Sequence, residues 1–222
     1  YSGLSVDEHS AEPGEVQAVE LPTGSNDIAV VGMACSFTDA KTPEALWHNL
    51  IEQRSLIAPL KANRWGNAHA APRWGARIDD VDRFDPDFFG LTEEEARLCD
   101  PQERLVTQAL FHALQHAGLR ADTLRGTRTG LFLGYEYAEY EHHMRRNLHR
   151  IPNAPALSSS SPIYYLANRI SFLYDFKGPS EVVNASCASS GLAIHRACQS
   201  LALGECDVAI CGGVSLNLFE DD

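Results

Sequence analysis

A cysteine stands where an extended pattern gives way to a helical one, and that position favours nucleophilic chemistry. The apolar segment 181–183 predicts a strand, the stretch 186–191 (Ser-Cys-Ala-Ser-Ser-Gly) a sharp turn, and the small-residue run 191–198 a helix. The unpaired N–H groups of a helix's first turn, together with the helix dipole, favour a thiolate at Cys187. The pattern therefore predicts a nucleophile at a helix start, although a helix N-terminus by itself supplies no base.

Three histidines could serve Cys187 or a metal ion, and their spacing argues against both roles. His195 follows Cys187 by about two helical turns, roughly 12 Å along the axis, so we expect a core or groove histidine. His112 and His116 share a helix face at a spacing that could bind zinc, yet no third ligand or Glu-flanked motif accompanies them. We expect both to be packing or surface residues, with no metal bound.

The other cysteines and a glycine pair have plainer interpretations. The six cysteines lie at positions 35, 99, 187, 198, 206 and 211, and none forms a Cys-x-x-Cys motif. Most have apolar or small neighbours, so we expect structural free thiols everywhere except at Cys187. Gly212-Gly213 could suggest a phosphate loop, but no Lys or Gly-rich helix start follows, and close helix–strand packing explains the pair better.

Composition sets the class of protein. The 222 residues are 44% hydrophobic and 22% charged, which is ordinary for a globular chain with ample core. A formal charge of −12 argues against a nucleic-acid or anionic-membrane surface. No apolar run reaches the roughly 20 residues of a membrane span, and no secretory signal opens the chain. We expect a cytoplasmic protein.

The elements that must position Cys187 follow from periodicity and capping signals. Short apolar runs at 27–34, 129–134 and 207–214 predict further buried strands, in addition to 181–183. Helices are predicted from Thr42 with a buried stripe, from Thr92 with a capping box, from Asp100-Pro101 to Gly118, near 165–173, and from 191 to Gly204. The stripe of the first helix consists of Leu46 and Leu50, with Trp47 and Ile51 as further candidates. Segment 55–90 is expected to be irregular, with a hairpin near 74–78, and residues 1–25 have the composition of a flexible linker. Together these patterns predict a layered α/β domain with a buried central helix.

Several ordered motifs resemble the β-ketoacyl synthase domains of modular polyketide synthases. They are Asp-Ile-Ala-Val-Val-Gly-Met-Ala-Cys at 27–35, Asp-Pro-Asp-Phe-Phe-Gly at 85–90, Asp-Pro-Gln-Glu-Arg-Leu at 100–105, Asn-Arg-Ile-Ser at 168–171, Lys-Gly-Pro-Ser at 177–180, and the block 197–214. Any one alone is weak, but they occur in the family's order from about residue 26 to the end. Thiolases and chalcone synthases fit the Asp-Pro-Gln block less well.

The resemblance implies a thiolase-like α/β fold, with residues 26–222 as the N-terminal half of a ketosynthase domain. Its sheet would be mixed and mostly buried, around a central buried helix. In this family a cysteine takes an acyl chain from an acyl carrier protein, and a malonyl-type extender then condenses with that chain after losing carbon dioxide. The resemblance implies that Cys187 is the nucleophile, with its backbone N–H as one oxyanion donor. It further implies no directly bound cofactor, substrates carried on phosphopantetheine, a homodimer, and a multienzyme of antibiotic biosynthesis.

The basic segment 142–146 could bind the phosphopantetheine phosphate or the carrier protein, but a solvated face is the favoured interpretation.

Two departures from the family pattern qualify this interpretation. Where the family usually has Asp-Thr-Ala before the cysteine, this chain has Asn184, Ala185 and Ser186. The family's two histidines lie in His-Gly-Thr-Gly-Thr and Asn-x-Gly-His motifs, and neither motif occurs in the 222 residues. We therefore expect an acyltransferase whose condensation needs a C-terminal half, on the same or a separate chain, so that this chain alone is inactive in condensation. One alternative is a non-elongating or split ketosynthase that binds carrier protein and transacylates. Another is a portion of a longer protein, whose end point then has no biological significance.

Overall fold

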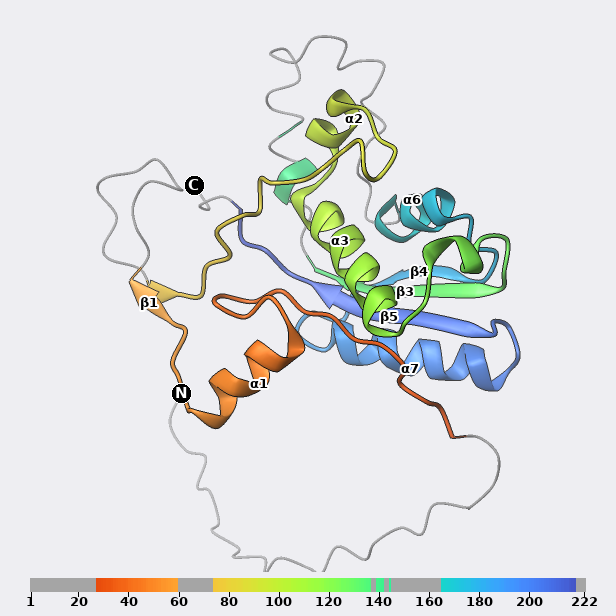
Figure 1. The fold of residues 1–222 in the computed structure, drawn as a ribbon, viewed down its shortest axis with the longest axis horizontal. Helices are drawn as coiled ribbons and strands as arrows, with labels where there is room; N and C mark the ends of the chain where they lie inside the picture. Colours follow the sequence, from red (N-terminus) through yellow and green to blue (C-terminus); the bar gives the residue numbers. More distant parts are fainter. Residues whose placement is uncertain (1–26, 60–73, 137–138, 142–143, 145–164, 219–222) are drawn as a thin grey trace, which may run out of the picture.

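The computed structural model describes residues 27–59, 74–136, 139–141, 144 and 165–218 (Figure 1). The expected linker at 1–25 and the basic segment 142–146, apart from residue 144, lie outside these residues. The helices, in chain order, are α1 (Pro43–Ile51), α2 (Glu93–Leu98), α3 (Pro101–His116), the 3-10 turn η2 (Ala121–Leu124), α6 (Tyr165–Tyr174) and α7 (Ser189–Ala202). The strands are β1 (Ala58–Pro59), β2 (Trp74–Gly75), β3 (Thr129–Tyr135), β4 (Ser180–Val183) and β5 (Val208–Val214).

A three-stranded parallel sheet forms the centre, in the order β4-β3-β5. Leu131 of β3 lies opposite Ser180 of β4 and Ile210 of β5, which fixes the register of both ladders. The sequence predicted a mixed sheet, but the three described strands all run in one direction. Antiparallel pairing occurs instead between β1 and β2, close to the predicted hairpin.

Helices cover both faces of this sheet, so that β3 is buried along its whole length (Figure 1). On one face Leu131 and Leu133 pack with Leu110 and Leu114 of α3 and with residues of α6. On the other face Phe132 packs against α7, together with Ala193, Ala197 and Cys206. This alternation follows from the period of two along a strand, which sends successive side chains to opposite faces.

Capping residues set the helix boundaries as the sequence predicted. The Thr42 side chain accepts from the Ala45 N–H at 3.2 Å, and Pro43 occupies the first helical position. Thr92 and Glu95 form a complete capping box at α2, and the Asp100 side chain accepts from the Gln102 N–H at 2.8 Å at α3. Gly118 and Gly204 follow α3 and α7 with φ values of 68° and 69°, a backbone conformation that glycine adopts without steric cost.

Two predictions for the N-terminal region are wrong. Residues 27–36 form no strand, and Val30 is 80% exposed, because no described strand forms a ladder with this segment. The segment instead crosses α3, where a Cβ on Gly32 would lie 2.5 Å from the Ala113 carbonyl oxygen. The Met33 N–H also donates to Nδ1 of His116 at 3.4 Å. The apolar run is thus held by a helix rather than by a sheet.

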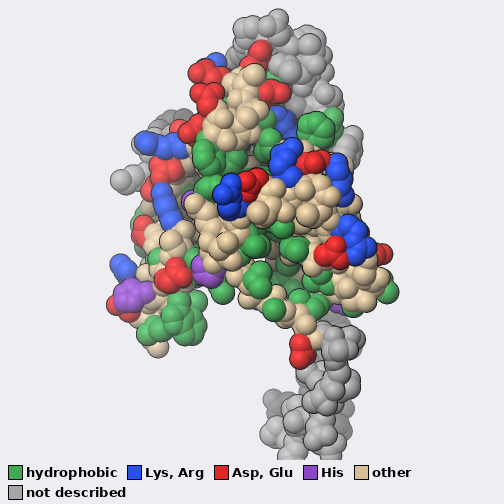
Figure 2. Space-filling model, turned by 45° about the vertical axis from the view of Figure 1, so that its right-hand side comes forward, with side chains coloured by type: hydrophobic (Ala, Val, Ile, Leu, Met, Phe, Trp, Pro, Cys, Tyr) green, Lys and Arg blue, Asp and Glu red, His purple; other side chains and the backbone are tan. Residues whose placement is uncertain are grey.

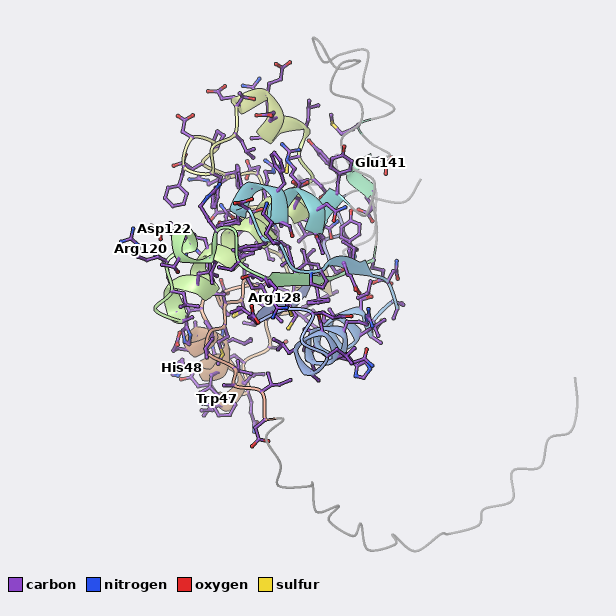
Figure 3. The ribbon with its side chains drawn as sticks, turned by 90° about the vertical axis from the view of Figure 1, so that its right-hand side faces the viewer. Trp47, His48, Arg120, Asp122, Arg128 and Glu141 are labelled. Atoms are coloured by element: carbon purple, nitrogen blue, oxygen red, sulfur yellow. The ribbon has the colours of Figure 1, made fainter. Side chains whose placement is uncertain are left out.

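The predicted buried stripe of α1 is also wrong. Leu46 is only half-buried, while Trp47, Leu50 and Ile51 are exposed, Leu50 by 60%. The side chain that α1 buries is Asn49, whose amide donates to the Asp39 carbonyl at 3.2 Å. Figure 3 shows Trp47 and His48 on the side of α1 that faces away from the sheet. The apolar face of α1 thus lies on the surface.

Helix α7, the expected buried central helix, packs one face against the sheet. Ser189, Ala193, Ala197 and Ser200 face the sheet, while Ile194 is 51% exposed on the opposite side. The helix is also tied to the edge strand β4 by a bidentate ion pair between Arg196 and Glu181, at 3.0 and 2.9 Å. On the face drawn in Figure 2, green hydrophobic side chains lie at the surface among interspersed acidic and basic groups. None of the described helices is long and apolar enough to cross a membrane.

Candidate active site

Cys187 lies in a tight turn between the end of β4 and the start of α7. Two backbone hydrogen bonds close this turn, from Ala188 N–H to the Ala185 carbonyl at 3.1 Å and from Ser189 N–H to the Ser186 carbonyl at 3.0 Å. Ser186 has a φ of 51°, in the left-handed region that few residues other than glycine adopt. A strained residue of this kind persists only where its surroundings hold it, and such residues cluster at functional sites. Cys187 itself is exposed.

The buried hydroxyl of Ser189 holds the turn through two hydrogen bonds. It accepts from the Ala185 N–H at 2.9 Å and donates to the Ser186 carbonyl at 2.6 Å. Ala188, the N-cap of α7, forms no side-chain cap, so the first N–H groups of the helix have no side-chain acceptor at that residue. Cys187 therefore lies one residue before the N-cap of α7, at a helix start whose partial positive charge favours an anion.

Glycines at the carboxyl ends of β3 and β5 let the start of α7 approach the sheet. A Cβ on Gly134 would lie 2.7 Å from the backbone carbon of Ser189 and 2.8 Å from the Ser190 nitrogen. A Cβ on Gly213 would lie 2.1 Å from the Ser190 hydroxyl. Close helix–strand packing was predicted for the pair Gly212-Gly213; it explains Gly213, but not Gly212, where an added Cβ would meet nothing within 4 Å. The resulting position, outside the carboxyl ends of parallel strands, is where α/β sheets commonly bind ligands.

A carboxylate that the sequence analysis did not single out, Glu136, lies beside the turn that holds Cys187. Glu136 directly follows β3, and its Oε1 accepts from the Ser186 hydroxyl at 2.8 Å. Asn184 links the same two residues, since its amide donates to the Glu136 carbonyl at 3.1 Å and its Oδ1 accepts from the Ser186 N–H at 3.1 Å. The Ser186 Oγ lies 3.9 Å from Cys187 Sγ. The only sequence signal for Glu136 was its position after a strand whose carboxyl end meets that of β4.

The motif at 100–104 forms a buried polar network at the same edge of the sheet. The Tyr135 hydroxyl at the end of β3 donates to Asp100 at 2.9 Å, and the side-chain carbonyl of Gln102 accepts from the Leu216 N–H at 3.0 Å. Burial raises the pKa of Asp100, and it raises the pKa of Glu103 to about 7. Arg169 lies 3.4 Å from Glu103 and opposes that shift. The motif therefore joins α3, β3 and the segment after β5, and so supports the edge that carries Cys187.

The histidines lie away from Cys187 or outside the described residues. His195 is exposed on α7, so it is a surface residue rather than the expected core or groove histidine. His112 and His116 are exposed on α3, where the His112 ring contacts Gln115 at 3.2 Å. Within the described ranges, no group of three or more His, Cys, Asp or Glu side chains could hold a metal ion. His142 and His143 lie outside the described residues.

The remaining cysteines divide by burial. Cys99 and Cys206 are buried and Cys35 and Cys198 half-buried, as expected of structural thiols, whereas Cys211 is exposed. Burial raises the pKa of Cys99, which keeps that thiol protonated. Cys211 departs from the prediction because β5 has no described strand on its outer side. The arrangement thus offers one exposed thiol at a helix start, suited to accept an electrophilic carbon.

Comparison with known proteins identifies the fold and its relatives. Residues 25–221 match the family model described as "Beta-ketoacyl synthase, N-terminal domain". A subunit of the phenolphthiocerol/phthiocerol polyketide synthase of Mycobacterium tuberculosis is 35% identical over 98% of this chain. The polyketide synthase PksM of Bacillus subtilis is 36% identical over 86% of it. The alignments span 15% and 4% of these two relatives, so the chain corresponds to a small part of each.

Solved ketosynthase domains have the same fold. The oxazolomycin ketosynthase domain of Streptomyces albus superposes with a TM-score of 0.75 and 34% identity, over 85% of this chain and 35% of that one. The ketosynthase from module 6 of the bacillaene synthase of Bacillus subtilis gives a TM-score of 0.73 and 31% identity, over 86% of this chain and 32% of that one. The predicted thiolase-like α/β fold is confirmed.

Proposed function

Since the chain belongs to the β-ketoacyl synthase family, as a part of its N-terminal domain, we propose that it contributes the nucleophile for polyketide chain elongation. Cys187 accepts an acyl chain from the phosphopantetheine thioester of an acyl carrier protein. The acylated cysteine is then attacked by the carbanion that a malonyl-type extender leaves when it loses carbon dioxide. Under this proposal the chain holds no cofactor of its own, because the carrier's phosphopantetheine delivers both substrates.

The observation that carries the proposal is the placement of Cys187. It is exposed, it lies two residues before the start of α7, and the turn around it contains a strained Ser186 and is held by the Ser189 hydroxyl. A thiol so placed can reach a carrier-bound thioester, and its own backbone N–H can stabilise the negative charge on the thioester oxygen. Cys211 is the other exposed cysteine among the described residues, but it lies within a strand.

Acyl loading tests this role directly. The 222-residue chain is incubated with an acyl N-acetylcysteamine thioester, which mimics the end of phosphopantetheine, and its intact mass is measured. We expect one acyl adduct per chain, absent from Cys187→Ala and retained by Cys211→Ala. An adduct that survives Cys187→Ala, or a folded wild-type chain that takes up no acyl group, would contradict the proposal.

Condensation requires groups that the 222 residues do not contain. Neither of the family's histidine motifs occurs in the sequence, and these motifs belong to the family's C-terminal half. We propose that this half, on the same or a separate polypeptide, seats on the exposed apolar faces of α1 and α7, where Leu50 and Ile194 lie. The chain alone is then expected to form no carbon–carbon bond. Condensation product from the chain by itself, detected by mass spectrometry, would refute this requirement.

A second candidate is a non-elongating ketosynthase that binds carrier protein and only transacylates. It is favoured by the residues before the nucleophile, where Asn184 and Ser186 bind Glu136 in place of the family's usual Asp and Ala. The two candidates separate when a C-terminal half with both histidine motifs is added. Elongation predicts a condensed product, whereas the non-elongating role predicts loaded Cys187 and no product. Homodimer formation stays a prediction, which light scattering can test.

A further inference from the structure

Two contacts of the Ser186 hydroxyl link Cys187 to a carboxylate, Glu136, that lies outside the motifs named above. Oε1 of Glu136 lies 2.8 Å from Oγ of Ser186, and that Oγ lies 3.9 Å from Sγ of Cys187. The second distance is long for a hydrogen bond to sulfur. Catalytic hydrogen bonds are often long in a free protein and shorten when the substrate binds.

The single hydroxyl proton of Ser186 decides the direction of this link. A hydroxyl can donate once, and the carboxylate of Glu136 is both the closer and the stronger acceptor. The lone pairs of the Ser186 oxygen therefore remain for the thiol proton of Cys187. The structure gives the Ser186 hydroxyl as the donor in both contacts. Once its proton is held by Glu136, the Ser186 oxygen can take the thiol proton, and the path then leads from Cys187 through Ser186 to Glu136.

The residues that build this connection are the ones in which the chain departs from the usual Asp-Thr-Ala. An alanine at 186 would have no hydroxyl to reach Glu136. Asn184 bonds both the carbonyl of Glu136 and the N–H of Ser186, each at 3.1 Å, and so holds the two residues together. The strained φ of 51° at Ser186 is maintained by these bonds and by Ser189. One direct hydrogen bond to the carboxylate and the Asn184 bridge to the Glu136 backbone thus keep Glu136 next to the turn that holds Cys187.

The other charged groups between β4 and α7 are already paired. Glu181 and Arg196 bind each other at 2.9 and 3.0 Å. His195 lies about two helical turns beyond Cys187. Among the described residues around the turn, Glu136 is therefore the group that is hydrogen-bonded to a neighbour of the thiol and can accept its proton.

We propose that Ser186 and Glu136 form a proton relay for Cys187 during acyl loading; this inference rests on the proposed acyl-accepting role of that cysteine. As Sγ attacks the thioester carbon, its proton passes to Oγ of Ser186 while the Ser186 proton passes to Glu136. When the tetrahedral intermediate collapses, the bond between carbon and the carrier sulfur breaks, and Glu136 returns the proton through Ser186 to that leaving thiolate. The products are the acyl-cysteine and a carrier thiol, with Ser186 and Glu136 restored. The relay supplies the base that a helix start alone lacks.

Two acyl donors separate a relay from a merely structural role. Loading of the 222-residue chain is timed with an alkyl thioester, whose leaving thiolate needs a proton, and with a thiophenyl ester, whose more acidic thiol leaves readily without one. Glu136→Gln and Ser186→Ala should slow loading from the alkyl thioester by about tenfold to a hundredfold, in the range of general acid–base effects. Loading from the thiophenyl ester should slow by a clearly smaller factor, because removal of the Cys187 proton is needed with either donor while the thiophenolate leaves without a proton. Glu205→Gln, an exposed carboxylate beyond the far end of α7, serves as the matched control and should load at the wild-type rate.

Each outcome bears on one claim. The relay is contradicted, while the role of Cys187 stands, if both relay variants load from the alkyl thioester at the wild-type rate. It is also contradicted if a variant's loading rates from the two donors fall by the same factor. If the folded wild-type chain forms no adduct at Cys187 with either donor, the acyl-accepting role fails and the relay fails with it.

Discussion

Two apolar runs of similar composition end in opposite environments. Strand β3 is buried along all of its residues, whereas the run at 28–33 has no ladder and leaves Val30 and Val31 exposed. The difference lies in partners: β3 has a strand on each side and helices on both faces, while residues 28–33 cross only α3. An apolar run alone thus does not decide burial; the strands and helices that pack against it do. The exposed apolar faces of α1 and α7 resemble residues 28–33 in this respect.

The largest expected difference between the two regions is the cost of truncating an apolar side chain. Phe132→Ala should lower the free energy of unfolding by about 3–5 kcal/mol, because the ring is fully buried between β3 and α7. Val31→Ala, the matched change in the exposed run, should stay within about 0.5 kcal/mol. Urea unfolding followed by circular dichroism measures both. Similar losses for the two variants would show that residues 28–33 are buried in solution.

The buried network next to β3 should make stability depend on pH. Glu103 has a pKa of about 7 in the folded chain against 4.5 as its reference value, so the folded chain keeps a proton that the unfolded chain releases. Its contribution is therefore fully present below about pH 4.5 and is lost as the pH rises toward 7, by about 3 kcal/mol at most. Glu103→Gln should flatten this decline, and Glu205→Gln should not. A stability that rises between pH 4.5 and 7, or an unchanged slope in Glu103→Gln, would contradict the shift.

A methyl group at the carboxyl end of β3 should disturb the turn that holds Cys187. Gly134→Ala would place a carbon 2.7 Å from the Ser189 backbone, so we expect a loss of about 1–3 kcal/mol and slower acyl loading at Cys187. Gly212→Ala is the matched control, because nothing lies within 4 Å of the added carbon. Thermal unfolding and timed acylation test the pair. Equal behaviour of the two variants would mean that α7 does not rest on Gly134.

A substitution on the apolar face of α1 is expected to change the free energy of unfolding of the isolated chain least. Leu50→Gln should change the free energy of unfolding by no more than about 0.5 kcal/mol, because Leu50 is 60% exposed. The same change should weaken binding of an added C-terminal half, which calorimetry measures. If Leu50→Gln instead unfolds the chain, α1 packs more deeply than the structure places it.

Local signals predicted the elements around the site well. Thr42, Thr92 and Asp100 each cap a helix, and Gly204 ends α7, because these effects depend on a few neighbouring residues. The position of Cys187 at a helix start followed from the same kind of signal. The ordered motifs identified the family, which the comparisons confirm.

Non-local contacts could not be predicted in the same way. The buried side of α1 could not be inferred because Asn49 finds its partner in the Asp39 carbonyl rather than in an apolar layer. Glu136 is brought to Ser186 by the parallel pairing of β3 and β4, which no short motif encodes. The placement of Cys187 at a helix start was therefore predicted from sequence, whereas the carboxylate beside it came only from the fold.

The site of acylation is the most direct test of the account. Trypsin should cut after Lys177 and Arg196, which leaves Cys187 as the sole cysteine in the peptide 178–196, while Cys198, Cys206 and Cys211 share the peptide 197–222. After incubation with an acyl N-acetylcysteamine thioester, tandem mass spectrometry should locate the acyl group on 178–196, at Cys187. An acyl group found on 197–222, or none on a folded chain, would contradict the assignment of Cys187 as the acyl acceptor.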